Sequence, residues 1–120
     1  MNTNKVNEIL HDWLETNGDK GTEKYPVRKL EEIAVNCVSL SETWLNKVDK
    51  NEKVSFELSL HDEDGAIADT MQGIDRDNLS NTIFKIIVLY GDTYSKISLM
   101  KYAYVGGEKK TELVGELEIS

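Results

Sequence analysis

The side chains best suited to chemistry in this sequence lie in one acidic stretch around its second histidine. His61 is followed directly by Asp62, Glu63 and Asp64, and an imidazole beside carboxylates can form a metal site or an acid–base pair. A calcium loop needs oxygen ligands at positions 1, 3 and 5, glycine at position 6 and glutamate at position 12. With Gly65 at position 6, leucine and methionine occupy positions 1 and 12. The stretch therefore predicts a polar hairpin turn rather than a metal site.

The other candidate groups lack the neighbours that reactive side chains need. His11 adjoins the apolar positions of a predicted helix, and Cys37 lies among apolar residues without a basic neighbour that would lower its pKa. Asp75 and Asp77 have no apolar neighbours that would desolvate a catalytic acid. The sequence contains no nucleophile elbow, Walker motif or dinucleotide fingerprint. We expect no cofactor, no metal and no catalysis; an enzyme that uses His61 and nearby acids is the third choice.

Charge excludes two further classes of function. The chain carries 14 basic and 22 acidic residues, a net charge of −8, whereas non-specific binding to nucleic acids or anionic membranes needs a positive surface. Tyrosines on the predicted strands could stack on bases, but few cations accompany them. Between residues 62 and 77 the sequence has six acids and one arginine, a local charge of −5. The negative charge is therefore concentrated rather than spread evenly.

A concentrated negative surface is typical of a protein that docks on a basic partner. Solubility and protection of a sheet edge are the alternative explanation of the acids. We expect a small inhibitor that masks the functional surface of a basic protein, such as a nuclease or a nucleoprotein complex. An immunity protein or antitoxin would act in this way, and so would a phage-encoded inhibitor of a host defence nuclease (an anti-CRISPR). The predicted contact residues are Asp62, Glu63, Asp64, Asp69, Asp75, Asp77 and Tyr94.

The predicted inhibitor is a monomer, and the alternative is a structural adaptor or small acidic chaperone that acts as a dimer. One cysteine excludes an intramolecular disulfide and favours a reducing compartment. The N-terminal residues lack the apolar core of a signal peptide. The densest apolar run, 83–90, is interrupted by a lysine and is shorter than the roughly 20 residues of a membrane span. We therefore expect a cytoplasmic protein with no membrane or nucleic-acid partner.

Apolar spacing in the first half predicts two helices. Residues 6–14 place their apolar side chains on one helical face, and Gly18 is a suitable stop. A second helix is predicted from about Pro26 to Asp49. An alternative breaks it near Val38, because the residues that follow fit a capping box. The two helices are expected to pair in antiparallel fashion.

After residue 51 the apolar period changes to two, which predicts strands. Residues 54–60 form a half-buried strand with one wet face, and 66–71 return as a short partner. Residues 83–90 fit a helical or a strand pattern, and their β-branched content favours a strand. Two more strands, 96–105 with a bulge near Met100 and 111–119, flank a turn at Gly106-Gly107. The prediction is a single α+β domain, 1–120, with a helix pair packed on a four- or five-stranded antiparallel meander.

Overall fold

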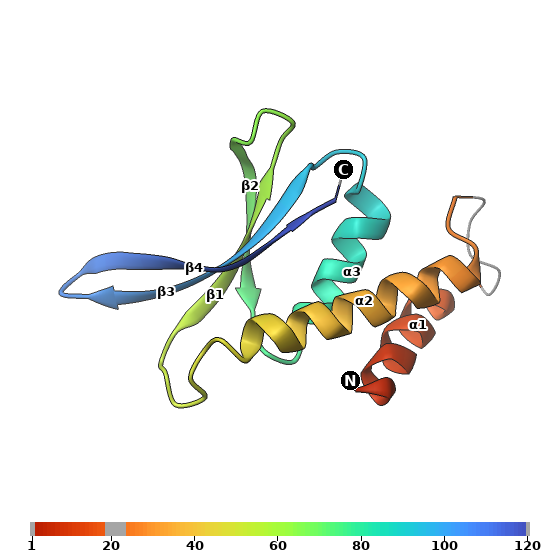
Figure 1. Ribbon diagram of the computed structural model, residues 1–120, viewed down its shortest axis with the longest axis horizontal. Coiled ribbons are helices and arrows are strands. Elements are labelled where there is room, and N and C mark those ends of the chain that lie inside the picture. Colours follow the sequence, from red (N-terminus) through yellow and green to blue (C-terminus); the bar gives the residue numbers. More distant parts are fainter. Residues whose placement is uncertain (1, 19–23, 120) are drawn as a thin grey trace.

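The computed structural model describes residues 2–18 and 24–119 and has three helices and four strands in that part of the chain (Figure 1). The strands form one antiparallel sheet in the order β2-β1-β3-β4. The predicted α+β class, the N-terminal helix pair and the four-stranded antiparallel sheet are confirmed. The elements are α1 (Thr3–Asn17), α2 (Val27–Leu45), β1 (Ser55–His61), β2 (Ile67–Ile74), α3 (Leu79–Tyr90), β3 (Lys96–Val105) and β4 (Glu108–Glu118).

The first two helices are present as predicted, but α2 ends at Leu45, four residues before the predicted end at Asp49. Helix α1 ends at Gly18, whose φ of 97° suits glycine and whose N–H donates to the carbonyl of Leu14. Helix α2 runs without a break, so the alternative end near Val38 is wrong. Ser41, which that alternative placed in a capping box, instead donates its hydroxyl to the Cys37 carbonyl at 2.8 Å inside the helix.

The prediction of a strand at 83–90 is wrong, because these residues belong to α3. Ile83, Phe84 and Ile86 are almost completely buried in the core, and this packing outweighs the weak preference of β-branched residues for strands. The start of α3 is fixed by Asp75 and Asn78, whose side chains each accept the other's backbone N–H at 2.8 Å. Helix α3 connects β2 to β3, and β3 pairs with β1 rather than with β2. The sheet is therefore not the simple meander that we predicted.

Strand β1 is central in the sheet and buried on both faces. Phe56, Leu58 and Leu60 join the core beneath the helices, as their alternation predicts. The opposite face was expected to be wet, but Glu57 and His61 are buried there as well. Figure 1 shows the β1–β2 and β3–β4 hairpins running in clearly different directions. On this face the Lys109 ammonium contacts the Glu57 carboxylate at 3.2 Å and the Ser98 hydroxyl contacts the His61 imidazole at 2.9 Å, so side chains of the neighbouring strands help to cover β1.

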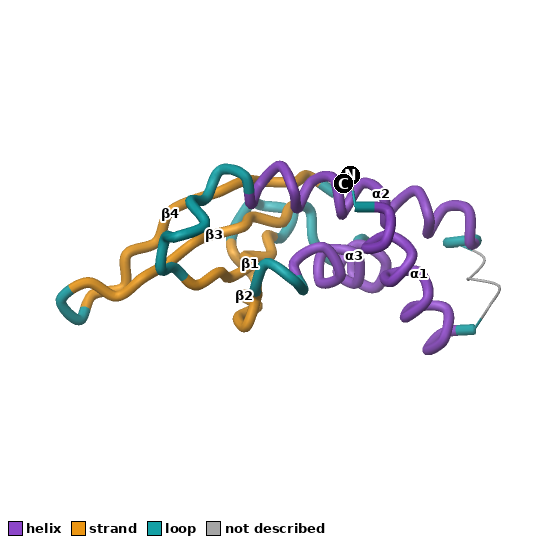
Figure 2. The backbone as a smooth tube through the Cα atoms, turned by 90° about the horizontal axis from the view of Figure 1, so that it is seen from below, coloured by secondary structure: helices purple, strands orange, loops and turns teal. Residues whose placement is uncertain are grey.

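The outer part of the β3–β4 hairpin, residues 100–113, extends beyond the rest of the molecule (Figures 1 and 2). We call this segment the arm. Its turn is at Gly106 and Gly107, both with positive φ, as predicted for a tight hairpin. The predicted bulge is also present, as a register shift between Leu99 and Met100. In the described residues, no helix has both the length and the apolar character needed to cross a bilayer.

Candidate protein-binding surface

Five of the predicted contact residues gather where the β1–β2 turn meets the loop between α3 and β3. We call Asp62, Glu63, Asp64, Asp69 and Tyr94 the acidic end. The Tyr94 hydroxyl donates to the Asp69 carboxylate at 3.2 Å, which joins the loop to β2. Ser95, the next residue of that loop, donates its hydroxyl to the Asp62 carbonyl at 2.5 Å. Residues far apart in the sequence therefore form one surface at the upper edge of Figure 1.

Asp75 and Asp77 lie at the other end of β2 and do not belong to this surface. The Asp75 carboxylate accepts the N–H groups of Asp77 and Asn78 at 2.9 and 2.8 Å, so it stabilises the start of α3. The Asp77 carbonyl accepts a hydrogen bond from the Lys5 ammonium. The single surface that we predicted from the local charge of residues 62–77 is therefore divided between two places.

The acids within the acidic end have different roles. The Asp62 carboxylate accepts the N–H groups of Asp64 and Ala66 at 2.9 and 3.0 Å, which is the bonding of a turn. Glu63 and Asp64 are exposed, and their carboxylates make no hydrogen bond or ion pair with any described residue. They are the charges that an incoming partner would meet. Asp62 shapes the turn that presents them.

Two tyrosines form the aromatic part of this surface. The rings of Tyr90 and Tyr94 meet edge to face, with centroids 6.3 Å apart, and half of Tyr90 is exposed. Partial burial, and then the Asp69 carboxylate, raise the pKa of the Tyr94 hydroxyl. Tyr94 is half-buried rather than fully exposed. Sequence reasoning missed Tyr90, because its place beside Tyr94 depends on the helical form of residues 79–90.

His61 is a buried structural residue at the base of the acidic turn. It is 8% exposed, with Nδ1 3.1 Å from the Gly65 carbonyl and Nε2 2.9 Å from the Ser98 hydroxyl. A carbonyl can only accept, so Nδ1 donates to Gly65, and in the neutral form of the ring Nε2 accepts from the Ser98 hydroxyl. A serine paired with a histidine resembles an activated nucleophile, but Ser98 is only 2% exposed, which leaves its hydroxyl out of a substrate's reach. The contacts fix the turn that carries the acids.

The remaining chemical candidates have ordinary surroundings. His11 is exposed on α1, 3.3 Å from Glu15. Cys37 is buried, and burial raises the pKa of its thiol to about 12, so it is almost entirely protonated at neutral pH. Within residues 2–18 and 24–119 no three histidine, cysteine or acidic side chains are grouped closely enough to share a metal ion.

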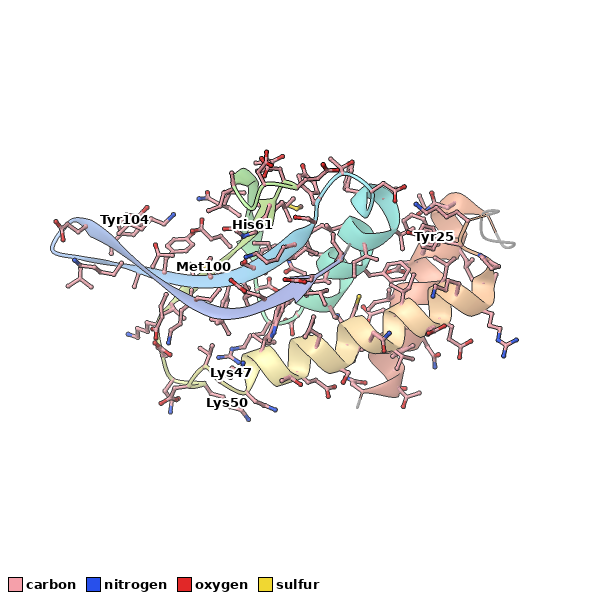
Figure 3. The ribbon with its side chains drawn as sticks, turned by 45° about the horizontal axis from the view of Figure 1, so that its top comes forward. Tyr25, Lys47, Lys50, His61, Met100 and Tyr104 are labelled. Carbon is pink, nitrogen blue, oxygen red and sulfur yellow. The ribbon has the colours of Figure 1, made fainter. Side chains whose placement is uncertain are left out.

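The arm carries a second exposed surface that sequence reasoning did not identify. Tyr104, Val105 and Leu113 are 68%, 62% and 49% exposed, and Figure 3 shows Tyr104 far out on the hairpin, away from His61. Lys109, which pairs with Tyr104 in the outer part of the arm, extends its side chain back towards β1, and its ammonium lies 3.2 Å from the buried carboxylate of Glu57. The ion pair therefore ties the arm to the central strand. Simple alternation along β4 would put Leu113 on the same face as the buried Gly115, and the bulge moves it to the opposite face.

We found no match between this chain and any protein-family model, curated protein or solved structure. The surfaces of the chain itself are therefore the basis for a functional inference.

Proposed function

We propose that this protein is an inhibitor that binds a basic protein through the acidic end and masks its functional surface. The immunity or antitoxin setting and the phage setting, in which a host defence nuclease is blocked (an anti-CRISPR), both fit this action. The observation that carries the proposal is the pair of unpaired, exposed carboxylates of Glu63 and Asp64 at the same end of the molecule as the Tyr90–Tyr94 ring pair, which the Tyr94–Asp69 hydrogen bond joins to β2. Carboxylates supply attraction to a basic partner, and aromatic rings supply buried contact area.

The acidic end is held in one shape before any partner arrives. The carboxylate of Asp62 closes the turn, the imidazole of His61 holds the Gly65 carbonyl, and the Tyr94–Asp69 bond joins the adjacent loop. A fixed surface loses less conformational entropy when it binds. Fixed charges of one sign also accelerate the encounter with a partner of opposite sign, an effect that salt weakens.

The test is a double charge reversal, Glu63→Lys with Asp64→Lys. It leaves Asp62 in place, because that carboxylate closes the turn. The matched control is Glu8→Lys with Glu31→Lys, at exposed acids of α1 and α2 that make no contact with charged side chains in the described chain. Each double variant changes net charge from −8 to −4, so the two differ only in where the charge is removed.

The tagged chain is used to capture partners from the native host, which are identified by mass spectrometry, and association rates are measured at low and moderate salt. We expect a basic nuclease or nucleoprotein to be captured. Reversal at the acidic end should slow association about tenfold or more and flatten its salt dependence, whereas the control should have a much smaller effect. Equal effects of the two variants, or capture of no basic protein, would refute the proposal.

A second candidate is a dimeric adaptor or small acidic chaperone, and the arm is the observation that favours it. Exposed Tyr104, Val105 and Leu113 are the kind of apolar groups that a subunit interface covers. Light scattering on the pure protein distinguishes the candidates. A dimer at micromolar concentration that Tyr104→Lys converts to monomer would support the adaptor, and a monomer throughout would argue against it.

A further inference from the structure

A groove of about 510 Å³ lies between α2 and the last residues of β4, and it uses none of the residues of the acidic end. Its apolar lining includes Ile33 and Leu40 of α2, Ile87 of α3 and Leu117 of β4. Leu40, Ile87 and Leu117 are only partly buried, so the fold leaves some of this apolar surface uncovered. Figure 3 shows the end of β4 running beside α2 and α3.

The end of β4 also presents free backbone groups beside this groove. β4 is an edge strand, because β3 is its neighbour on one side only. The Ile119 N–H donates to the Ser95 carbonyl at 2.9 Å, and the register with β3 is regular from there back to Gly115. The backbone groups of successive residues point alternately to the two sides of a strand. Those of Glu116 and Glu118 are therefore directed away from β3, and both residues are exposed.

An open strand edge beside an apolar groove is a recurrent binding site for an extended peptide. The peptide adds one strand to the sheet, and its backbone bonds to the edge strand while alternate side chains enter the groove. Opposite residues of neighbouring strands share a face of the sheet. One set of peptide side chains would therefore lie against Leu117 and the helices, and the other set beside Glu116 and Glu118.

The two glutamates indicate which side chains fit the outer face. Glu116 lies 3.5 Å from Lys96, and Glu118 makes no ion pair or side-chain hydrogen bond with any described residue. Cross-strand pairs of opposite charge stabilise a sheet, and like charges placed opposite each other destabilise it. A second copy of this chain is disfavoured, because symmetric antiparallel pairing centred on residues 116–118 would place glutamate opposite glutamate. A strand with basic residues on its outer face avoids this repulsion.

We propose that the end of β4 and the adjoining groove bind an extended peptide segment in which aliphatic and basic residues alternate. The segment pairs with β4 as an added strand. Its aliphatic side chains pack against Leu40, Ile87 and Leu117, and its basic side chains lie beside Glu116 and Glu118. This site has other residues and another mode of binding than the acidic end, so the inference does not depend on the inhibitor function.

The probe is the peptide acetyl-KIKVK-amide, added to ¹⁵N-labelled protein, and the measurement is amide hydrogen exchange. We expect exchange at Glu116 and Glu118 to slow about fivefold or more as the peptide saturates, because their N–H groups gain acceptors. Exchange at Leu117, whose N–H points towards β3, should stay unchanged. The control acetyl-KKKIV-amide has the same composition and charge without the alternation. It should bind about tenfold more weakly, although the chain of net charge −8 attracts both peptides.

Two variants of one residue separate the backbone contact from the charge. Glu118→Gln keeps the N–H and removes the carboxylate, so it should weaken binding of acetyl-KIKVK-amide about threefold. Glu118→Pro also removes the N–H and should weaken binding about tenfold further. Proline is tolerated on an edge strand where the N–H faces solvent.

Three results would overturn the proposal. One is equal binding of the two peptides, and another is equal affinity of the two variants for acetyl-KIKVK-amide. The third is exchange at Glu118 that slows with protein concentration in the absence of peptide, which would identify a second copy of the chain as the occupant. Should Glu118→Pro fail to fold, the exchange pattern of the wild type and the comparison of the two peptides decide the matter.

Discussion

Gly115 is the position at which one added methyl group should do most damage. A Cβ atom there would lie 2.5 Å from Cδ1 and 2.7 Å from Cε2 of Trp44, whose ring is 3% exposed. Real contacts of this kind are longer than 3.0 Å, so either the ring or the backbone of β4 has to shift. The ring belongs to the packed core, and its movement would separate α2 from β4.

Forcing an extra carbon into a packed core costs about 1–3 kcal/mol. Two carbon atoms of a rigid ring are overlapped, so we expect Gly115→Ala to lose about 3 kcal/mol of unfolding free energy. That loss is a large share of the roughly 5–15 kcal/mol typical of a domain. Urea unfolding measures it, and the midpoint should fall while the slope stays unchanged. Thr111→Ala, at an exposed position on the same strand, should change stability by less than about 0.5 kcal/mol.

A double-mutant cycle tests the stated cause. Trp44→Ala removes the indole ring that the new methyl would overlap. The double variant should therefore be more stable than the sum of the two single losses, by about 1 kcal/mol or more. Two results would contradict this cause: simple addition of the two losses, or a cost of less than about 0.5 kcal/mol for Gly115→Ala. Either would mean that contact between β4 and the Trp44 ring of α2 is not the reason why position 115 requires glycine.

Two further predictions concern charge and pH. Lys109→Met leaves the buried Glu57 carboxylate without its partner and should lower the free energy of unfolding in urea by about 1–3 kcal/mol. The control is Lys110→Met, which breaks an exposed ion pair and should cost less than about 0.5 kcal/mol. Equal losses in the two variants would contradict the role of Glu57. Burial raises the pKa of the Cys37 thiol from 9.0 to about 12, so above pH 9 the unfolded chain releases a proton that the folded protein keeps, and stability falls as pH rises from 9 towards 12. Relative to Cys37→Ala, the wild type should lose about 1.4 kcal/mol between neutral pH and pH 10, and parallel pH profiles would refute the assignment.

Local patterns in the sequence were sufficient for most of the elements. The spacing of Val6, Ile9 and Trp13 determines the buried face of α1, and Gly18 ends that helix because glycine accepts positive φ. Alternation in β1 and the glycine pair 106–107 determine a strand and a hairpin in the same way. In each case the deciding interaction involves residues within a few positions of one another. Such interactions can be read without knowledge of the fold.

The acidic end was only partly predictable. Its charges are visible in the sequence, but the sequence does not show that Asp75 binds the backbone of α3 while Glu63 and Asp64 remain free. Tyr90 and Tyr94 become neighbours only because the segment before them is helical. Which acids belong to a surface depends on hydrogen bonds that form after the chain has folded.

By itself, the sequence determined the acidic charge, the helix pair, the hairpins and the absence of recognisable catalytic motifs. Tertiary structure alone decided that residues 79–90 form a helix, that His61 is buried, and that a groove lies between α2 and the end of β4. The physical reason is the range of the interactions. Side-chain period and turn chemistry act between near neighbours, whereas burial and hydrogen-bond partners depend on segments brought together from distant parts of the chain.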